Sequence, residues 1–121
     1  MVNALFDTCI LIDYLTKVEA AKVEMTRYES CAISLITWME IMVGATPDDE
    51  QLLRAWLDTF RIISIDKSIA ARAVDIRKQY RIKLPDAIVW ASAQAHSLLL
   101  VSRNIKDFPA DQPGVRVPYL L

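Results

Sequence analysis

The sequence has 121 residues but contains only two cysteines, two glycines and one histidine. Two cysteines provide no disulfide framework, so we expect Cys9 and Cys31 to be reduced thiols of a cytoplasmic protein. With His96 as its only histidine, the chain has no histidine pair for catalysis and no Cys–His pattern that indicates zinc. The longest uncharged run, residues 87–102, is too short and too polar to span a membrane. No basic segment precedes the first apolar run, so no secretory signal is visible.

The composition is that of a folded domain, with 54% hydrophobic and 24% charged residues. We expect a single domain over residues 1–121, because two domains would each be too small to bury a core. The net charge of −1 conceals an uneven distribution. Residues 1–66 carry 5 basic and 11 acidic side chains, whereas residues 67–121 carry 9 basic and 4 acidic ones. The basic stretch 77–83 is either a phosphate-binding surface or the solvated end of a helix.

Short apolar runs alternate with segments of helical periodicity along the whole chain. This order predicts an α/β fold with a largely parallel sheet of four or five strands. The predicted strands are residues 2–6, 31–35, 61–65, 98–102 and an edge strand at 115–117. The predicted helices are residues 9–15, 18–29, 37–43, 46–60, 66–80 and 84–95. Ligands of such sheets bind beyond the carboxyl ends of the strands, where Asp7 and Asn104 are expected to lie.

Three carboxylates, Asp7, Glu40 and Asp86, stand apart from other charged residues in apolar sequence. Glu40 is the only charged residue in the stretch 31–47, so we expect it to lose solvation and to need a partner or a proton. A shared hard cation, Mg²⁺ or Mn²⁺, would satisfy all three acids with oxygen ligands. The alternatives are structural: Asp7 would cap the first helix, and Asp86 would interact with the dipole of its helix.

Four short motifs follow one another in a distinctive order. They are Asp7-Thr8 after the first strand, Glu40 after a hydroxyl-rich turn, Leu-Pro-Asp-Ala at 84–87, and Val-Ser-Arg-Asn-Ile-Lys-Asp-Phe at 101–108. In this order they resemble the PIN domain family and, more narrowly, the VapC-type toxin ribonucleases of bacterial toxin–antitoxin pairs. The resemblance extends from Asp7 to about Tyr119 and implies a three-layer α/β/α fold.

The resemblance also implies a metal-dependent endoribonuclease, a hydrolase that cleaves RNA phosphodiester bonds. Asp7, Glu40 and Asp86 match the three acids that hold Mg²⁺ or Mn²⁺ in the family, and Asn104 and Asp107 match further catalytic positions. Asn104 adds no charge, so a second metal site would be weak or would depend on Asp107. The implied substrate-binding residues are Thr8, Arg81, Lys83, Ser102 and Arg103, with Lys106 as a further cation near the phosphate. In this mechanism the metal activates a water, and no side chain acts as the nucleophile.

The implied partners are RNA, a small VapB-like antitoxin and a second copy of the chain in a homodimer, with no membrane. The antitoxin's C-terminal segment would lie in a groove over the active site. The side chains that could form this groove are Trp38, Met39, Met42, Trp56 and Trp90.

Two other functions remain open from the sequence. The first is a PIN-fold protein that binds RNA or a partner without cutting, which Asn104 in place of an acid keeps open. The second is a phospho-receiver domain, which has a similar length and an acid after its first strand. The single acid at Asp7 and the expected helix cap at Asp66 argue against the receiver domain.

Overall fold

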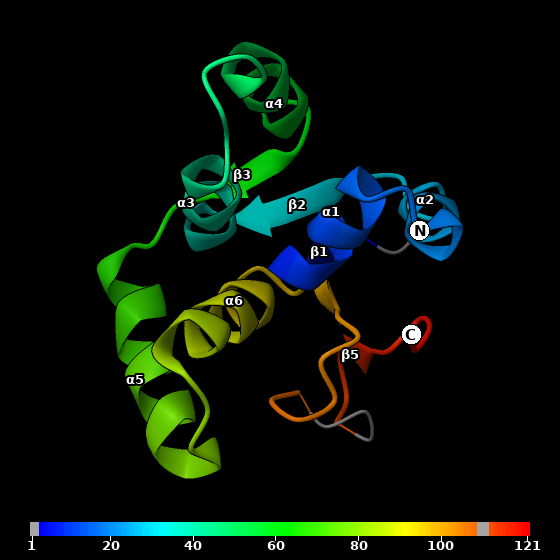
Figure 1. The fold of residues 1–121 in the computed structure, drawn as a ribbon. Coiled ribbons are helices and arrows are strands. Elements are labelled where there is room, and N and C mark those ends of the chain that lie inside the picture. Colours follow the sequence, from blue (N-terminus) through cyan, green and yellow to red (C-terminus); the bar gives the residue numbers. More distant parts are fainter. Residues whose placement is uncertain (1–2, 109–111) are drawn as a thin grey trace.

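The computed structural model describes residues 3–108 and 112–121. Five parallel strands form one sheet in the order β3-β2-β1-β4-β5 (Figure 1). The strands are β1 (Ala4–Phe6), β2 (Cys31–Ser34), β3 (Arg61–Ile63), β4 (Leu99–Val101) and β5 (Val115–Arg116). The parallel sheet and its edge strand confirm the predicted α/β class.

Within the residues that the structure describes, six helices cover the two faces of the sheet. They are α1 (Thr8–Leu15), α2 (Glu19–Met25), α3 (Leu35–Val43), α4 (Glu50–Leu57), α5 (Lys67–Tyr80) and α6 (Leu84–Ala95). Successive side chains of a strand point to opposite faces, which creates two cores. Leu5 of β1 packs in the core with α5 and α6, whereas Ala4 and Phe6 pack in the core with α1 to α4. The result is the expected three-layer α/β/α arrangement (Figure 1).

Several predicted helix boundaries are wrong: α3 begins at Leu35 rather than at residue 37, and α4 ends at Leu57 rather than at residue 60. The helix expected from residue 46 begins at Glu50, because the Asp49 carboxylate accepts a 2.7 Å hydrogen bond from the Thr46 amide and residues 46–49 form a turn. Leu52 on α4 is 77% exposed, so the apolar residues of this helix are only partly buried. The helix expected over 18–29 ends at Met25, and the chain turns at Thr26.

The elements that carry the motifs meet at one edge of the sheet. The parallel strands β1, β2 and β4 are neighbours, so their carboxyl ends lie together. α1 begins directly after β1, and α3 begins directly after β2. The side chains that follow these strands are therefore close in space although they are far apart in sequence. No helix in the described part of the chain has the length and apolar character that crossing a membrane requires.

Candidate active site

Asp7 lies at the carboxyl end of β1 and caps α1. Its Oδ1 accepts a 2.8 Å hydrogen bond from the Thr8 amide, and its Oδ2 accepts a 2.8 Å hydrogen bond from the Ser102 hydroxyl. The Cys9 thiol lies 3.4 Å from the same Oδ2. Burial and the charge of Asp7 raise the pKa of Cys9 to about 11, so this thiol remains protonated at neutral pH. Asp7 therefore combines the structural role of a cap with a place at the predicted edge of the sheet.

Glu40 reaches the same edge from α3. The Thr8 hydroxyl donates a 2.8 Å hydrogen bond to Glu40 Oε1 and lies 3.0 Å from the Thr37 hydroxyl. The side chain is exposed, so the expectation that Glu40 loses its solvation is wrong. The physical reason is that α3 has an exposed face despite its apolar sequence, with Met39 45% and Val43 86% exposed.

Asp86 lies in the first turn of α6 and is half-buried. Desolvation, the adjacent Asp107 carboxyl and the charges of Asp7 and Glu40 together raise the pKa of Asp86 to about 7. Burial also raises the pKa of Asp7, with a further contribution from Glu40, against hydrogen bonds from Ser102 and Thr8 that lower it. Four carboxyl groups from different parts of the chain thus repel one another at one edge of the sheet.

The segment 102–108, here called the β4-exit loop, supplies the fourth acid. The Ser102 hydroxyl, which donates to Asp7, accepts a 3.0 Å hydrogen bond from the Asn104 amide. The Asn104 side-chain amide donates a 2.8 Å hydrogen bond to Asp107 Oδ2. Phe108 is fully buried and anchors the end of the loop in the core. Hydrogen bonds therefore connect Asp7 to Asp107 through Ser102 and Asn104.

The predicted cations divide into two groups. Arg81 and Lys83 are exposed in the turn between α5 and α6, and Lys83 precedes Asp86 by three residues. Arg77 donates a hydrogen bond to the Ile82 carbonyl, which ties this turn to α5. Arg103, in contrast, is engaged with the buried carboxylate of Asp13, at distances of 2.5 and 2.9 Å.

The oxygen-rich donor set suits a hard divalent cation such as Mg²⁺ or Mn²⁺. Among residues 3–108 and 112–121, the four site carboxyl groups form no ion pair, so their mutual repulsion is not neutralised by a lysine or arginine. No three His, Cys, Asp or Glu side chains of the described residues are grouped tightly enough to hold a metal in this conformation. Binding would therefore require side-chain rotation toward the ion. The chemistry of the site fits such a cation.

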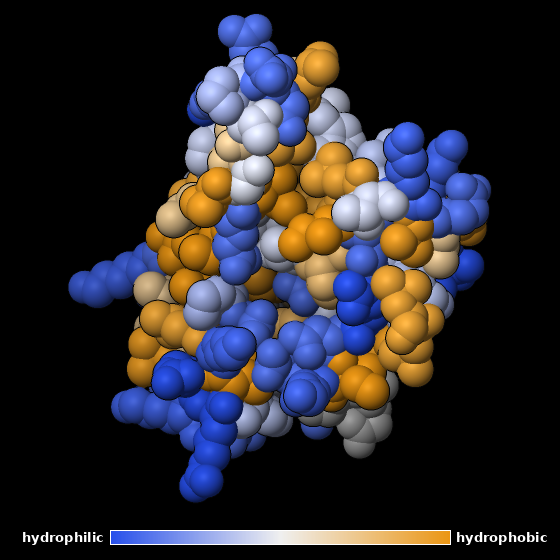
Figure 2. All heavy atoms as spheres, in the orientation of Figure 1, coloured by the Kyte–Doolittle hydropathy of each residue, from blue (hydrophilic) through white to orange (hydrophobic). Residues whose placement is uncertain are grey.

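An apolar groove begins beside Glu40 and runs between α1, α3 and α4. A cavity of about 380 Å³ is lined by Ile12, Leu15, Ile41 and Leu53 as well as Glu40. Figure 2 shows hydrophobic side chains gathered around the hollow between these helices. The space continues into a second cavity at α4.

Of the five side chains expected to form the groove, Trp56 lines the cavity at α4, whereas Trp38, Met39, Met42 and Trp90 line neither cavity. Trp90 is 3% exposed and packs against Tyr80 and Phe108 in the core on the other face of the sheet. Trp56 stacks on Tyr14, and Arg54 lies over the ring of Trp38. The tryptophans therefore serve different parts of the fold.

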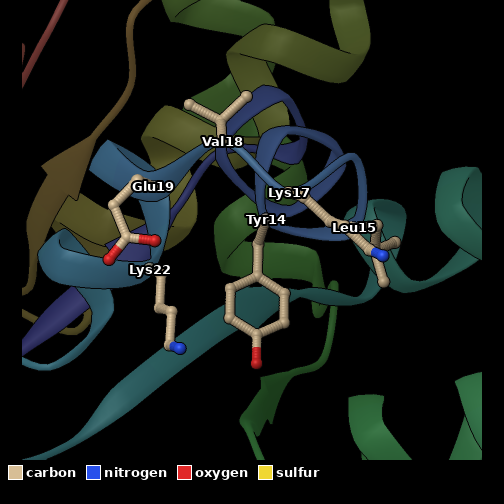
Figure 3. Close-up of a pocket in the computed structure, with 6 residues that line it drawn as sticks. All are labelled: Tyr14, Leu15, Lys17, Val18, Glu19 and Lys22. Carbon is tan, nitrogen blue, oxygen red and sulfur yellow. The ribbon is translucent and has the colours of Figure 1, made fainter.

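Another pocket, of about 450 Å³, lies at the turn between α1 and α2 (Figure 3). Tyr14, Leu15 and Val18 contribute apolar surface, and two lysines and a glutamate lie around them. It contains none of the four site carboxyl groups. Leu15 also lines the groove beside Glu40, so the two hollows share a wall.

The sequence analysis missed two buried carboxylates, Asp13 and Glu24, each 3% exposed and each paired with an arginine. Asp13 lies between Ile12 and Tyr14 in the apolar segment 10–15. The criterion of a solitary acid in apolar sequence, applied to Asp13, would have found it.

The fold and the site define an α/β/α protein with an acidic, metal-compatible centre at the carboxyl edge of a parallel sheet. The chain matches the PIN domain over residues 4–110 and belongs to the PIN domain family. It is 30% identical over 113 residues to Ribonuclease VapC10 of Mycobacterium tuberculosis, a match that covers 87% of this chain and 85% of that protein. The order of the strands also differs from the 2-1-3-4-5 order of receiver-like folds, which excludes the phospho-receiver alternative.

Two solved structures are similar over almost the whole chain. A toxin–antitoxin complex from Klebsiella pneumoniae has 52% identity and a TM-score of 0.92, with 98% of this chain and 99% of that chain covered. FitAcB from Neisseria gonorrhoeae has 25% identity and a TM-score of 0.80, with the same coverage.

Proposed function

We propose that this protein is an endoribonuclease that hydrolyses RNA phosphodiester bonds with the help of Mg²⁺ or Mn²⁺, and that it is the toxin of a toxin–antitoxin pair. The observation that carries the proposal is the convergence of Asp7, Glu40, Asp86 and Asp107 at one edge of the sheet, with the pKa of Asp86 raised to about 7. Similarity to a ribonuclease and to a toxin–antitoxin complex supports the same activity.

Asp7, Glu40 and Asp86 are the residues that would hold the ion. When bound, the ion supplies a water of lowered pKa and withdraws charge from the phosphoryl oxygens. Ser102 and the Thr8 amide orient the Asp7 carboxylate through 2.8 Å hydrogen bonds, and the Thr8 hydroxyl orients Glu40 in the same way. These contacts limit the side-chain freedom that the ligands lose when they bind the ion.

Asn104 and Asp107 extend the acidic edge. The amide of Asn104 holds the Asp107 carboxyl group beside Asp86. In this arrangement Asp107 supplies the negative charge that Asn104 lacks. We propose that Asp107 supports the site as a second carboxylate next to Asp86.

Arg81 and Lys83 are proposed to attract the RNA backbone toward the acidic edge. Both are exposed, and both precede the helix that carries Asp86. Figure 2 shows hydrophilic side chains gathered over the lower end of α5, close to the start of α6. Cations at this place offset the repulsion between phosphates and the carboxyl groups.

The central experiment is RNA cleavage by Asp7→Asn and Asp86→Asn variants. Each variant keeps the side-chain shape but removes one anionic ligand, so we expect cleavage to fall by at least about 100-fold, more than the loss typical of outer-sphere partners. Asp75→Asn, at an exposed position on α5, is the matched control and should retain full activity.

Removal of divalent ions provides the second part of this test. EDTA should abolish cleavage by the wild-type protein, and added Mn²⁺ should restore it. Cleavage that persists in EDTA, or in a nuclease-free preparation of either site variant, would contradict the proposal. RNA binding without any metal-dependent cleavage would favour the non-cutting PIN-fold alternative.

The proposed protein partner is a small antitoxin whose apolar segment occupies the groove between α1, α3 and α4. The groove leads to Glu40, so a segment bound there would block access to the acidic edge. Exposed Ile12, Leu15 and Val43 provide the apolar contact surface. A homodimer of the chain is a further prediction, which the molar mass in solution tests directly.

A further inference from the structure

Asp13 is a buried carboxylate at the junction of three segments. It lies on α1 and is 3% exposed. Arg103 of the β4-exit loop binds it with two donors, Nε at 2.5 Å and Nη2 at 2.9 Å. The hydroxyl of Tyr119, near the C-terminal end of the chain, donates a third hydrogen bond of 2.7 Å to Oδ2. The two arginine donors form a fork, which restrains the orientation of the guanidinium as well as its distance.

The arginine in this cluster lies between two residues of the site. Ser102 lies directly before Arg103, and its hydroxyl donates a hydrogen bond to Asp7. Asn104 lies directly after Arg103. Its backbone amide donates a hydrogen bond to the Ser102 hydroxyl, and its side-chain amide donates one to Asp107. A restraint on Arg103 therefore acts on the residues that hold two of the four site acids.

α1 holds the β4-exit loop at two points. Asp7 caps the start of the helix and accepts a hydrogen bond from Ser102. Asp13, six residues later on the same helix, accepts the fork from Arg103. Two attachments to one rigid helix restrain both the position and the direction of the loop, which a single hydrogen bond cannot do.

The same geometry argues against a direct role of Arg103 in phosphate binding. To reach a phosphate, the guanidinium would have to leave Asp13, which would then be a buried charge with Tyr119 as its only remaining side-chain donor among the described residues. Breaking one partner of a buried ion pair is strongly unfavourable. The arginine is thus better suited to hold its own loop than to contact RNA.

We propose that Asp13, acting through Arg103, is a positioning residue that sets the β4-exit loop so that Asn104 and Asp107 face the acidic site. This inference rests on the proposed ribonuclease function for its effect on catalysis. Its effect on the loop itself does not depend on that function.

The chain contains a matched control for the experiment. Glu24 is also 3% exposed, is also bound by an arginine fork, from Arg116 at 2.7 and 3.1 Å, and also accepts a tyrosine hydroxyl, from Tyr28 at 2.5 Å. This second cluster connects α2 to β5. Its side chains make no hydrogen bond to the β4-exit loop among the described residues, and the Arg116 carbonyl accepts a 3.1 Å backbone hydrogen bond from Ser102. Asp13→Asn and Glu24→Gln therefore remove the same kind of interaction, and only the first removes it from the loop.

Steady-state RNA cleavage is the first measurement. For Asp13→Asn we expect kcat to fall about 10- to 100-fold, with KM changed less than about 2-fold, because misplaced catalytic groups slow the reaction without removing substrate contacts. Arg103→Lys should show a similar loss, since an ammonium cannot reproduce the fork. The double variant Asp13→Asn/Arg103→Lys should have a kcat no lower than that of the less active single variant. Glu24→Gln, measured on folded protein, should keep the wild-type kcat.

NMR of the loop is the second measurement and needs no cleavage. The wild-type chain has two asparagines, Asn3 and Asn104, and Asp13→Asn adds one more, so the side-chain NH₂ signals of Asn104 are assigned from a short list of candidates. In Asp13→Asn we expect these signals and the Asn104 backbone amide to shift and to exchange faster with solvent. In Glu24→Gln they should remain as in the wild type.

The outcomes separate this inference from the proposed function. Wild-type protein without RNA cleavage, but with the Asn104 shifts in Asp13→Asn, would reject the nuclease and support the positioning role. Unchanged kcat and unchanged Asn104 signals in Asp13→Asn would overturn the positioning role. A raised KM in Arg103→Lys with normal Asp13→Asn kinetics would also overturn it, since Arg103 would then contact the RNA. Equal kcat losses in Asp13→Asn and Glu24→Gln would show that the loss comes from general destabilisation. That result would also overturn the positioning role.

Discussion

The hydroxyl of Ser102 connects Asp7 to Asn104 of the β4-exit loop. It donates to Asp7 and accepts from the Asn104 amide, and the side chain is fully buried. Both partners would lose their hydrogen bond if the hydroxyl were removed. A buried group without its partner is costly, so Asp7 and Asn104 would have to move to find another.

Substitution of this hydroxyl is a direct test of its role. We expect Ser102→Ala to lower kcat for RNA cleavage about 10- to 100-fold, as for other residues that orient metal ligands. The control is Ser92→Ala, which removes an equally buried hydroxyl that donates to the Ile88 carbonyl within α6. If both variants cleave RNA at the wild-type rate, Ser102 does not orient the site.

At the scale of elements, the sequence predicts best where the signal is local. The bounds of α6, residues 84–95, are as expected, because proline and an acid in the first turn mark a helix start. The start of α4 is missed because the side chain of Asp49 stabilises a turn that competes with the helix. The pair of Asp13 and Arg103 is missed because its members are 90 residues apart in the chain. Such a pairing depends on the strand order, which no local pattern contains.

The apolar groove between α1, α3 and α4 leads to a prediction at this scale. Leu15→Gln should weaken binding of the antitoxin at least about 10-fold, since a few apolar contacts dominate such interfaces. RNA cleavage by the free variant should be unchanged, because Leu15 is 41% exposed and is not among the residues proposed to hold the ion or to contact the RNA. The candidate partner to titrate by calorimetry is the product of any small reading frame adjacent to this gene.

The control for this titration is Val23→Gln, which changes a 53% exposed apolar residue on α2 outside the groove. It should bind the antitoxin with the wild-type affinity. Equal binding by Leu15→Gln and the wild type would place the antitoxin elsewhere on the molecule.

At the scale of the whole molecule, two buried carboxylate clusters fasten the C-terminal part of the chain. One links α1 to Arg103 and Tyr119, and the other links α2 to Arg116. In both clusters burial raises the pKa of the carboxyl group, but hydrogen bonds and charge from the arginine outweigh burial, so the net pKa is lowered. The ordinary pKa values of these groups are 3.8 for Asp13 and 4.5 for Glu24.

These lowered pKa values predict acid sensitivity. Between the lowered and the ordinary pKa the unfolded state binds more protons, so the free energy of unfolding decreases as the pH falls below about 4.5. At neutral pH each cluster should contribute about 1.5–3 kcal/mol, the range for hydrogen bonds to charged groups. Urea unfolding between pH 3 and 7 should show a shallower acid loss in Asp13→Asn and in Glu24→Gln than in the wild type.

The raised pKa of Asp86 has the opposite effect on stability. Between its ordinary and its raised pKa the folded state binds more protons, so the free energy of unfolding decreases as the pH rises toward 7. This effect is common to the wild type and both variants, so the differences between their curves isolate the two clusters. Parallel curves for all three proteins between pH 3 and 5 would contradict the assignment.

The strand order has a consequence for the time at which activity arises. The central strand, β1, is made long before its sheet neighbour β4, because helices α1 to α6 separate them along the chain. Asp7 and the Ser102 that orients it are 95 residues apart, which corresponds to about 5–20 s of translation at typical rates of about 5–20 residues per second. A nascent chain that already carries Asp7 and Glu40 therefore has no assembled active site. An assembled site can form only after Ser102 has been synthesised and has left the ribosome.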